Sequence, residues 1–180
     1  FEDSIVFLNA PIDDSTANDV IAQLLALDNM DPDRPITIYV NSPGGSMSGL
    51  SAVVDTMEFL ACDVSTYCIG QALGAAAVLF AAGTHGMRHM LPNSKIMLHQ
   101  PAMGSSWGKA TEIEIQAREM ENMRIWIDDK LAAYTGQSSE KIHKDLENDL
   151  FLNASEAIKY GIADSIVQKK TRAKHDNLMD

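Results

Sequence analysis

The feature that most constrains this fold is a glycine-rich corner that follows one β-branched strand and recurs after the next. Residues 36–41 (ITIYVN) favour a strand, and SPGGS leads from it into a helical pattern at 47–60. Residues 64–69 (VSTYCI) favour another strand, and GQALG leads from it into a small-residue helix expected at 72–82. Strands that alternate with helices predict βαβ units and therefore an α/β fold with a mainly parallel sheet. Ligands bind such sheets at the carboxyl ends of the strands, where both corners lie.

The rest of the chain continues this alternation, and its length of 180 residues predicts a single domain over residues 1–180. A short strand is expected at 5–8, followed by a helix at 16–27 with Asp14 or Ser15 as its cap. The later elements are expected to be a hairpin-like section at 87–99 around LPNS, a short helix after Ser138 or Ser139, a helix at 153–161 closed by Gly161, and a last strand in DSIV.

One segment is longer than the core of such a domain needs. Apolar residues at spacings of three, four and seven predict a single helix over about 109–134, which would span about 40 Å. The residues alone leave two interpretations open, a core helix with a frayed end or an arm that packs on another subunit.

The net charge of the chain bears on which macromolecules it can bind. The net charge of −11 disfavours nucleic acid and anionic membranes, which attract clustered lysine and arginine, so neither is expected as a partner.

No spacing of Cys and His resembles a metal site, and no cofactor is expected. Cys62 and Cys68 are expected to be reduced, because a domain of this size needs no disulfide. No apolar run is long enough to span a membrane, and no targeting peptide is visible.

Three stretches are candidates for chemistry. The glycines of NSPGG (41–45) expose backbone N–H groups that can hold an oxyanion, and the start of the helix after GQALG offers more of them. His99 in MLHQP follows a strand, and Asp149 lies in ENDLF. GQALGAAAV has the small residues of a nucleophile corner, yet it contains no Ser, Cys or Thr. Taken one at a time, each stretch also fits an ordinary turn, a packed helix or a structural histidine.

Longer motifs give these stretches a common context. They run through nearly the whole chain and read YVNSPGG, VVDTMEF, GQA, LFAAGTHGMR, LPNSKIMLHQP, EIEIQAREM, TGQSSEKI and FLNASEAIKYGIADSI. On these motifs the sequence resembles the proteolytic subunit of the Clp (caseinolytic) protease family. The resemblance implies a crotonase-like α/β fold of βαβ units with a protruding handle helix, so the long helix is interpreted as that handle.

The resemblance also implies an assembly. Subunits of the family, identical or paralogous, form heptameric rings that stack through the handles. AAA+ ATPases of the ClpC, ClpX or ClpA type feed unfolded protein into the chamber. The expected compartment is then the cytoplasm, or the stroma of a plastid or other organelle.

The family's site can be carried over residue by residue. Its nucleophilic serine lies in a GQAxS motif, and here GQALG puts Gly74 at that position. Its catalytic histidine and aspartate match His99 and Asp149, and the oxyanion donors would be the backbone N–H groups of Gly45 and Ala75.

Two further pairs of residues bear on ATPase docking and on the contact between rings. Tyr39 and Tyr67 match the region of the groove where the ATPase loops dock, although they also fit ordinary strand aromatics. Many active members carry an Asp-Arg pair that links the rings, and here those positions are Glu147 and Asn148. Loss of the arginine removes a bidentate ion pair and favours a ring that mates with a different, catalytic partner.

The missing serine decides the expected function. Without a hydroxyl at position 74, His99 has nothing to deprotonate and no acyl-enzyme can form. The sequence therefore predicts a serine peptidase family member that is inactive by itself, like the inactive ClpR-type paralogues. Two alternatives stay open, an active ClpP endopeptidase inactivated by mutation and a crotonase-type acyl-CoA enzyme, whose ALGGG corner the ALGAAAV segment resembles.

Overall fold

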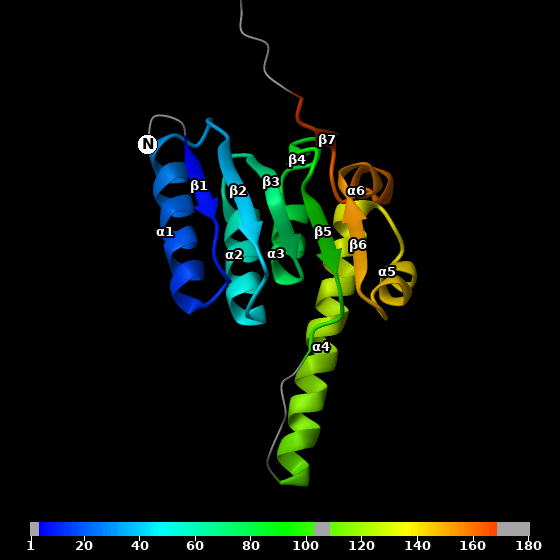
Figure 1. The fold of residues 1–180 in the computed structure, drawn as a ribbon. Helices are drawn as coiled ribbons and strands as arrows, with labels where there is room; N and C mark the ends of the chain where they lie inside the picture. Colours follow the sequence, from blue (N-terminus) through cyan, green and yellow to red (C-terminus); the bar gives the residue numbers. More distant parts are fainter. Residues whose placement is uncertain (1–3, 103–108, 169–180) are drawn as a thin grey trace, which may run out of the picture.

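The computed structural model describes residues 4–102 and 109–168, and its strands form one mixed sheet with helices packed against it (Figure 1). The sheet order is β1-β2-β3-β4-β7, while β5 pairs with β3 and β6 pairs with β5. All of these pairs are parallel except β5–β6. The strands are β1 Ile5–Leu8, β2 Ile36–Ser42, β3 Val64–Leu73, β4 Arg88–Met90, β5 Lys95–Leu98, β6 Leu150–Asn153 and β7 Ser165–Ile166.

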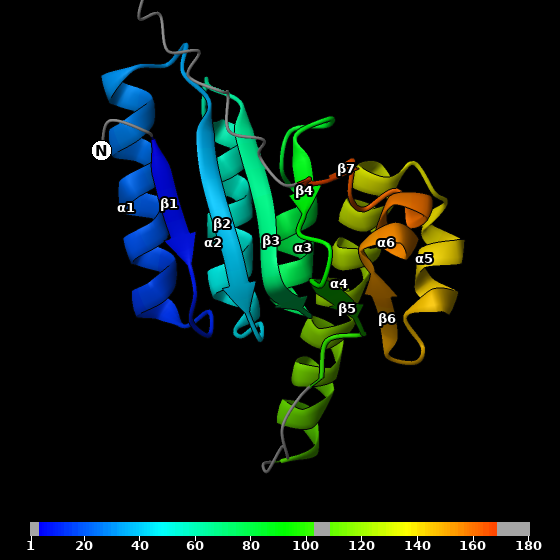
Figure 2. The ribbon, with the colours of Figure 1, turned by 45° about the horizontal axis from the view of Figure 1, so that its top comes forward.

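Five of the helices fall into two groups, and α4 belongs to neither. Figures 1 and 2 show α1, α2 and α3 side by side against one face of the sheet, while α5 and α6 lie beside β6. The helices are α1 Asp14–Met30, α2 Met47–Phe59, α3 Ala75–Ala81, α4 Ala110–Thr135, α5 Ser139–Asp145 and α6 Ala154–Tyr160. No helix among the described residues is long and apolar enough to cross a membrane.

The core lies between the sheet and the first three helices. In β2, residues Ile36, Ile38 and Val40 are buried and alternate with less buried residues, because successive side chains of a strand point to opposite faces. Every residue of α3 is buried. Its small side chains let this helix pack closely in the middle of the domain, directly after the corner at Gly74.

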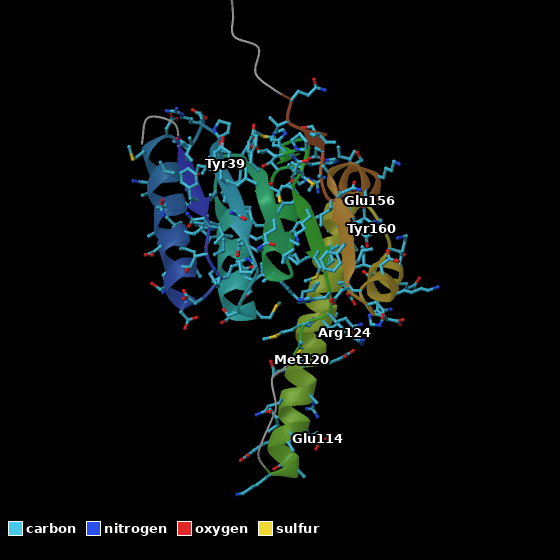
Figure 3. The ribbon with its side chains drawn as sticks, in the orientation of Figure 1. Tyr39, Glu114, Met120, Arg124, Glu156 and Tyr160 are labelled. Carbon is cyan, nitrogen blue, oxygen red and sulfur yellow. The ribbon has the colours of Figure 1, made fainter. Side chains whose placement is uncertain are left out.

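Helix α4 extends well beyond the body of the molecule (Figure 1). It occupies Ala110–Thr135, where the sequence predicts a helix over 109–134. Its buried residues are confined to the second half and include Ile127 and Leu131. Figure 3 places Arg124 near the point where the helix leaves the body, with Glu114 on the protruding part.

The structure corrects several predicted elements. The hairpin-like section is wrong, because β4 and β5 do not pair with each other and both run parallel to β3. Strand β3 continues to Leu73 instead of ending at residue 69, since its last residues pair with β5, and α3 therefore begins at Ala75. Helix α1 is capped by Asp13, whose side chain accepts a hydrogen bond from the Thr16 amide at 2.7 Å.

Candidate active site

The first corner of the site follows β2 and depends on close backbone contact. The Ile12 amide donates to the Gly44 carbonyl at 2.8 Å, and the Ser46 amide donates to the Ile12 carbonyl at 2.7 Å. A Cβ added to Gly45 would lie 2.1 Å from the Ile12 carbonyl oxygen, so only glycine fits there. The Gly45 amide donates no hydrogen bond to any described residue and is available to an oxyanion.

The second corner joins β3 to α3 at Gly74. Its φ of 53° and ψ of −116° turn the chain from strand to helix in one residue. The Gly74 amide donates to the Met97 carbonyl of β5 at 2.8 Å, and the Gly74 carbonyl accepts from the Ala77 amide at 3.0 Å. This is the sharp, strained strand-to-helix turn on which a nucleophile stands in α/β hydrolases.

A side chain at this corner would meet His99. A Cβ built on Gly74 would lie 3.0 Å from Nε2 and 3.0 Å from Cε1 of the imidazole. These distances are shorter than ordinary van der Waals contact, so the imidazole would shift by a few tenths of an ångström to admit a side chain, and a hydroxyl on that Cβ would then lie beside Nε2. Position 74 therefore lies directly beside the imidazole, and glycine carries no side chain there.

A pocket of about 270 Å³ joins the two corners to the histidine. It is lined by Gly45, Gly74, Ala75 and His99, together with Pro43, Gly44, Met47, Pro101 and Ala102. Like Gly45, Ala75 has an amide that donates no hydrogen bond within the described part of the chain. Both residues therefore line the same pocket as the imidazole.

Asp149 is the predicted site residue that the structure does not bring into this network. Leu98 pairs with Leu150 at the end of the β5–β6 ladder, so His99 and Asp149 follow at adjacent positions on the two strands. The Asp149 side chain is nevertheless exposed and makes no hydrogen bond to His99. His99 Nδ1 instead lies 3.1 Å from the Gln100 carbonyl oxygen.

Tyr39 and Tyr67 lie in a row of aromatic rings on the sheet. The register sets Phe7 opposite Tyr39, Tyr39 opposite Tyr67, and Tyr67 opposite His89. The ring centroids are 5.5, 5.1 and 4.5 Å apart in that order. Phe7 and His89 were missed from the sequence, and only the strand register reveals them as neighbours of the two tyrosines. Partial burial lowers the pKa of His89, and its Nδ1 lies 2.7 Å from Ser165 Oγ.

The described residues offer no cluster of three or more His, Cys, Asp or Glu that could hold a metal ion. Cys62 and Cys68 are buried and free, and burial raises the pKa of each thiol to about 11. Neither cysteine lines the pocket beside Gly74.

The matches found in known proteins cover most of the chain. The family model described as Clp protease matches residues 1–170. ATP-dependent Clp protease proteolytic subunit 1 of Bifidobacterium longum is 53% identical over 170 residues, which are 94% of this chain and 73% of that protein. Proteolytic subunit 2 of Corynebacterium jeikeium is 51% identical over 166 residues, 92% of this chain and 79% of that protein. Proteolytic subunit 3 of Nocardia farcinica is 49% identical over 167 residues, 92% of this chain and 76% of that protein.

Proposed function

The chain belongs to the Clp protease family, and from that premise we propose that it is a non-catalytic, ClpR-like subunit of an ATP-dependent Clp protease core. One observation carries the proposal. Position 74 is a glycine at the corner where a Cβ would stand 3.0 Å from His99 Nε2. The rest of the pocket supports acyl transfer, so the missing hydroxyl removes the first step of the reaction.

The residues that remain cannot replace that step. His99 can act as a general base only toward a hydroxyl or a bound water, and loss of the serine in a comparable triad costs about 10⁶ in turnover. The amides of Gly45 and Ala75 would still stabilise a tetrahedral oxyanion. In a related site, such groups alone retain about 10³–10⁴ over the reaction in water. A trace of hydrolysis is the most that this arrangement supports.

The proposed role is therefore structural. The subunit would contribute wall to a heptameric ring built with identical or catalytic ClpP-type subunits, using α4 as the handle between rings. The aromatic row of Phe7, Tyr39, Tyr67 and His89 would receive a loop of the AAA+ ATPase that delivers unfolded protein. Support for this comes from Phe7, which stays more than half exposed at the outer end of the row.

A fluorophosphonate probe tests the central point, because it reacts covalently with an activated serine. The purified chain is expected to resist labelling and to leave a fluorogenic peptide uncut, while a catalytic Clp subunit assayed in parallel is labelled and cuts it. Labelling of this chain, or peptide cleavage at a rate comparable to the catalytic subunit, would show that another atom attacks and would end the proposal.

A further inference from the structure

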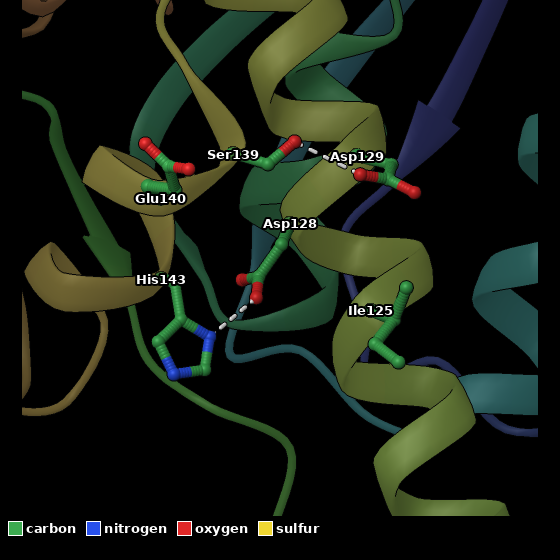
Figure 4. Close-up of a pocket in the computed structure, with 6 residues that line it drawn as sticks. All are labelled: Ile125, Asp128, Asp129, Ser139, Glu140 and His143. Carbon is green, nitrogen blue, oxygen red and sulfur yellow. Dashed lines mark hydrogen bonds and ion pairs between the residues drawn. The ribbon is translucent and has the colours of Figure 1, made fainter.

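A second pocket lies between α4 and α5, near the point where α4 leaves the body of the molecule (Figures 1 and 4). Its volume is about 220 Å³. We call it the acidic pocket, and the residues that line it are Ile125, Asp128, Asp129, Ser139, Glu140 and His143. It shares no residue with the pocket beside Gly74, so the proposed function leaves it without a role.

Asp128 forms the floor of the acidic pocket. It is the one buried residue of the lining, with 5% of its surface exposed, whereas Ile125, Asp129 and Glu140 are exposed. Its Oδ2 accepts a hydrogen bond from His143 Nδ1 at 2.8 Å. The other oxygen, Oδ1, is buried and has no hydrogen-bond partner among the described residues. Figure 4 shows this second oxygen turned into the space between Glu140 and His143. A buried carboxylate oxygen without a donor costs free energy, so its position indicates where a bound donor would be stabilised.

His143 does not compensate the charge of the Asp128 carboxylate. Arg124 Nη1 lies 3.1 Å from His143 Nε2, and a guanidinium has only donors. His143 Nε2 must therefore accept, which leaves the proton on Nδ1 for Asp128. The imidazole is neutral in this arrangement. Arg124 itself is ion-paired with Glu121, which already balances the charge of its guanidinium.

The rim of the acidic pocket adds further negative charge. Asp129 and Glu140 both contribute carboxylates, and only Asp129 has a partner within the described ranges, the neutral Ser139 hydroxyl at 2.9 Å. No lysine or arginine of the described part of the chain lines the pocket. The carboxylates of Asp128 and Asp129 come from α4 and that of Glu140 from α5, so a cation bound among them would contact both helices.

The surroundings of these carboxylates favour an organic cation with a compact head. No set of three or more acidic, His or Cys side chains in residues 4–102 and 109–168 is arranged to hold a metal ion. Ile125, which is 48% exposed, offers an apolar surface to an alkyl chain. An ammonium is compact and has three rotatable N–H donors, whereas a guanidinium is a wider planar fork. Because Asp128 Oδ1 is enclosed, the narrower head group fits this floor better.

We propose that the acidic pocket binds a primary aliphatic ammonium group. The ammonium would donate to Asp128 Oδ1 and to the rim carboxylates of Asp129 and Glu140, while its alkyl chain would cover Ile125. The inference goes beyond the proposed function, because it assigns a ligand to a site that shares no residue with the candidate active site. A free alkyl amine and the side chain of a lysine present the same chemical group.

Calorimetric titration of the full chain with n-butylammonium tests the site in about 0.15 M NaCl, where non-specific attraction between surface charges is screened. We expect saturable binding with a dissociation constant on the order of 1 mM. Tetramethylammonium is the matched control, since it is an isomer with the same charge but has no N–H donor, and it is expected not to bind. Absence of saturable butylammonium binding, or equal affinity for tetramethylammonium, would overturn the proposal.

Two variants test the assigned carboxylates. Asp128→Asn is expected to weaken butylammonium binding at least about tenfold, because it removes a charge-assisted hydrogen bond from the floor. Glu140→Gln should weaken it about threefold, since this carboxylate is exposed. Asp19→Asn on α1 and Glu147→Gln after α5 make the same charge changes outside the pocket and should leave binding unchanged. Losses no larger than those of the controls would contradict the site. Glu140 is exposed, so its variant keeps the test decisive if Asp128→Asn fails to fold.

Two further ligands distinguish the sources of the ammonium group. Pentane-1,5-diamine represents a free amine, and Nα-acetyl-lysine amide represents a lysine side chain of a polypeptide. Whichever binds more tightly identifies the source, and both results support the site provided that Glu140→Gln weakens the binding. Binding of either ligand that Glu140→Gln and Asp128→Asn leave unchanged would place it elsewhere on the protein and overturn the proposal.

These outcomes are independent of catalysis. A chain that binds butylammonium in the acidic pocket but is labelled by the fluorophosphonate probe keeps this site and loses the proposed function. A chain that resists the probe but binds no butylammonium loses the site alone.

Discussion

At the scale of single residues, the site differs from a serine triad at two positions: Gly74 carries no hydroxyl, and the exposed Asp149 side chain makes no hydrogen bond to His99. The positive φ of Gly74 is a conformation that L side chains adopt only under strain, which costs about 1–3 kcal/mol. A serine at this corner is held in a strained state as part of its function. Glycine removes both the hydroxyl and the strain, so the corner can keep its shape without performing catalysis. The corner at Gly45 is held by backbone hydrogen bonds of Ile12 with Gly44 and Ser46, which do not involve position 74.

The first prediction restores the nucleophile. Gly74→Ser should place a hydroxyl beside His99 Nε2, since a Cβ there is 3.0 Å from that atom. We expect covalent labelling by a fluorophosphonate and a loss of about 1–3 kcal/mol in unfolding free energy from the strained φ. Adding His99→Ala should reduce the labelling rate about 10²–10⁴-fold, because the general base is then absent. A folded Gly74→Ser protein that resists the probe would contradict this geometry.

At the scale of elements, much of the fold follows from the sequence and the exceptions have clear causes. The β-branched runs and the glycine corners locate β2, β3 and the helices after them, because each pattern is local. The pairing of β4 and β5 is not local. Short strands separated by a turn resemble a hairpin in sequence. In the structure β4 pairs with Thr66–Cys68 of β3, and β5 pairs with the extension of β3 at Gln71–Leu73. Strand β6 was missed, because its antiparallel pairing with β5 joins segments that are far apart in the chain.

One buried arginine joins β4 to the end of α4 and to Asp164, which directly precedes β7. Arg88 in β4 donates through Nε and Nη2 to Asp164 at 2.8 and 2.7 Å, and through Nη1 to the Tyr134 carbonyl at the end of α4. We predict that Arg88→Met lowers the unfolding free energy by about 3–5 kcal/mol, because it leaves the Asp164 carboxylate without its charge partner. Urea denaturation measures the change. Lys159→Met, on the exposed side of α6, is the control and should shift stability by less than about 0.5 kcal/mol. A similar small shift for Arg88→Met would mean that the pair does not hold β4, α4 and Asp164 together.

The same pair predicts a dependence of stability on pH. Partial burial acts to raise the pKa of Asp164, but hydrogen bonds from Arg88 and the charge of its guanidinium outweigh this and lower the pKa from 3.8 to about 2. A carboxyl with a lowered folded-state pKa stabilises the fold above the pKa of the unfolded chain, and this contribution is lost as pH falls from about 4 to about 2. We expect the unfolding free energy of the unaltered protein to lose about 1–2 kcal/mol more over that range than that of Asp164→Asn. Equal losses in urea titrations at each pH would contradict the assignment.

At the scale of the whole molecule, the surfaces proposed for function are built from residues far apart in the chain. Motif resemblance points to Gly45, Gly74, Ala75 and His99 as a candidate site, and all four residues line one pocket. The register of β5 and β6 places Asp149 next to His99, but the exposed Asp149 side chain makes no hydrogen bond to the imidazole. The aromatic row draws on β1, β2, β3 and β4, so its full extent depends on strand register. The acidic pocket depends on how α5 packs on α4, which no local sequence pattern encodes.

The aromatic row gives a prediction for the assembled particle. Tyr67 lies between Tyr39 and His89, with ring centroids 5.1 and 4.5 Å away, so Tyr67→Ala should open a gap in the middle of the row. In a complex of this chain with a catalytic Clp subunit and its ATPase, ATP-dependent degradation of an unfolded protein should fall at least about fivefold, as expected when a buried interface aromatic is lost. Hydrolysis of a small peptide, which needs no ATPase, should stay unchanged because the catalytic pockets are untouched. Phe59→Ala, which removes an exposed aromatic from α2, should affect neither rate. Equal losses of peptide and protein hydrolysis in Tyr67→Ala would point to a damaged ring, whereas unchanged protein degradation would remove the aromatic row from ATPase docking.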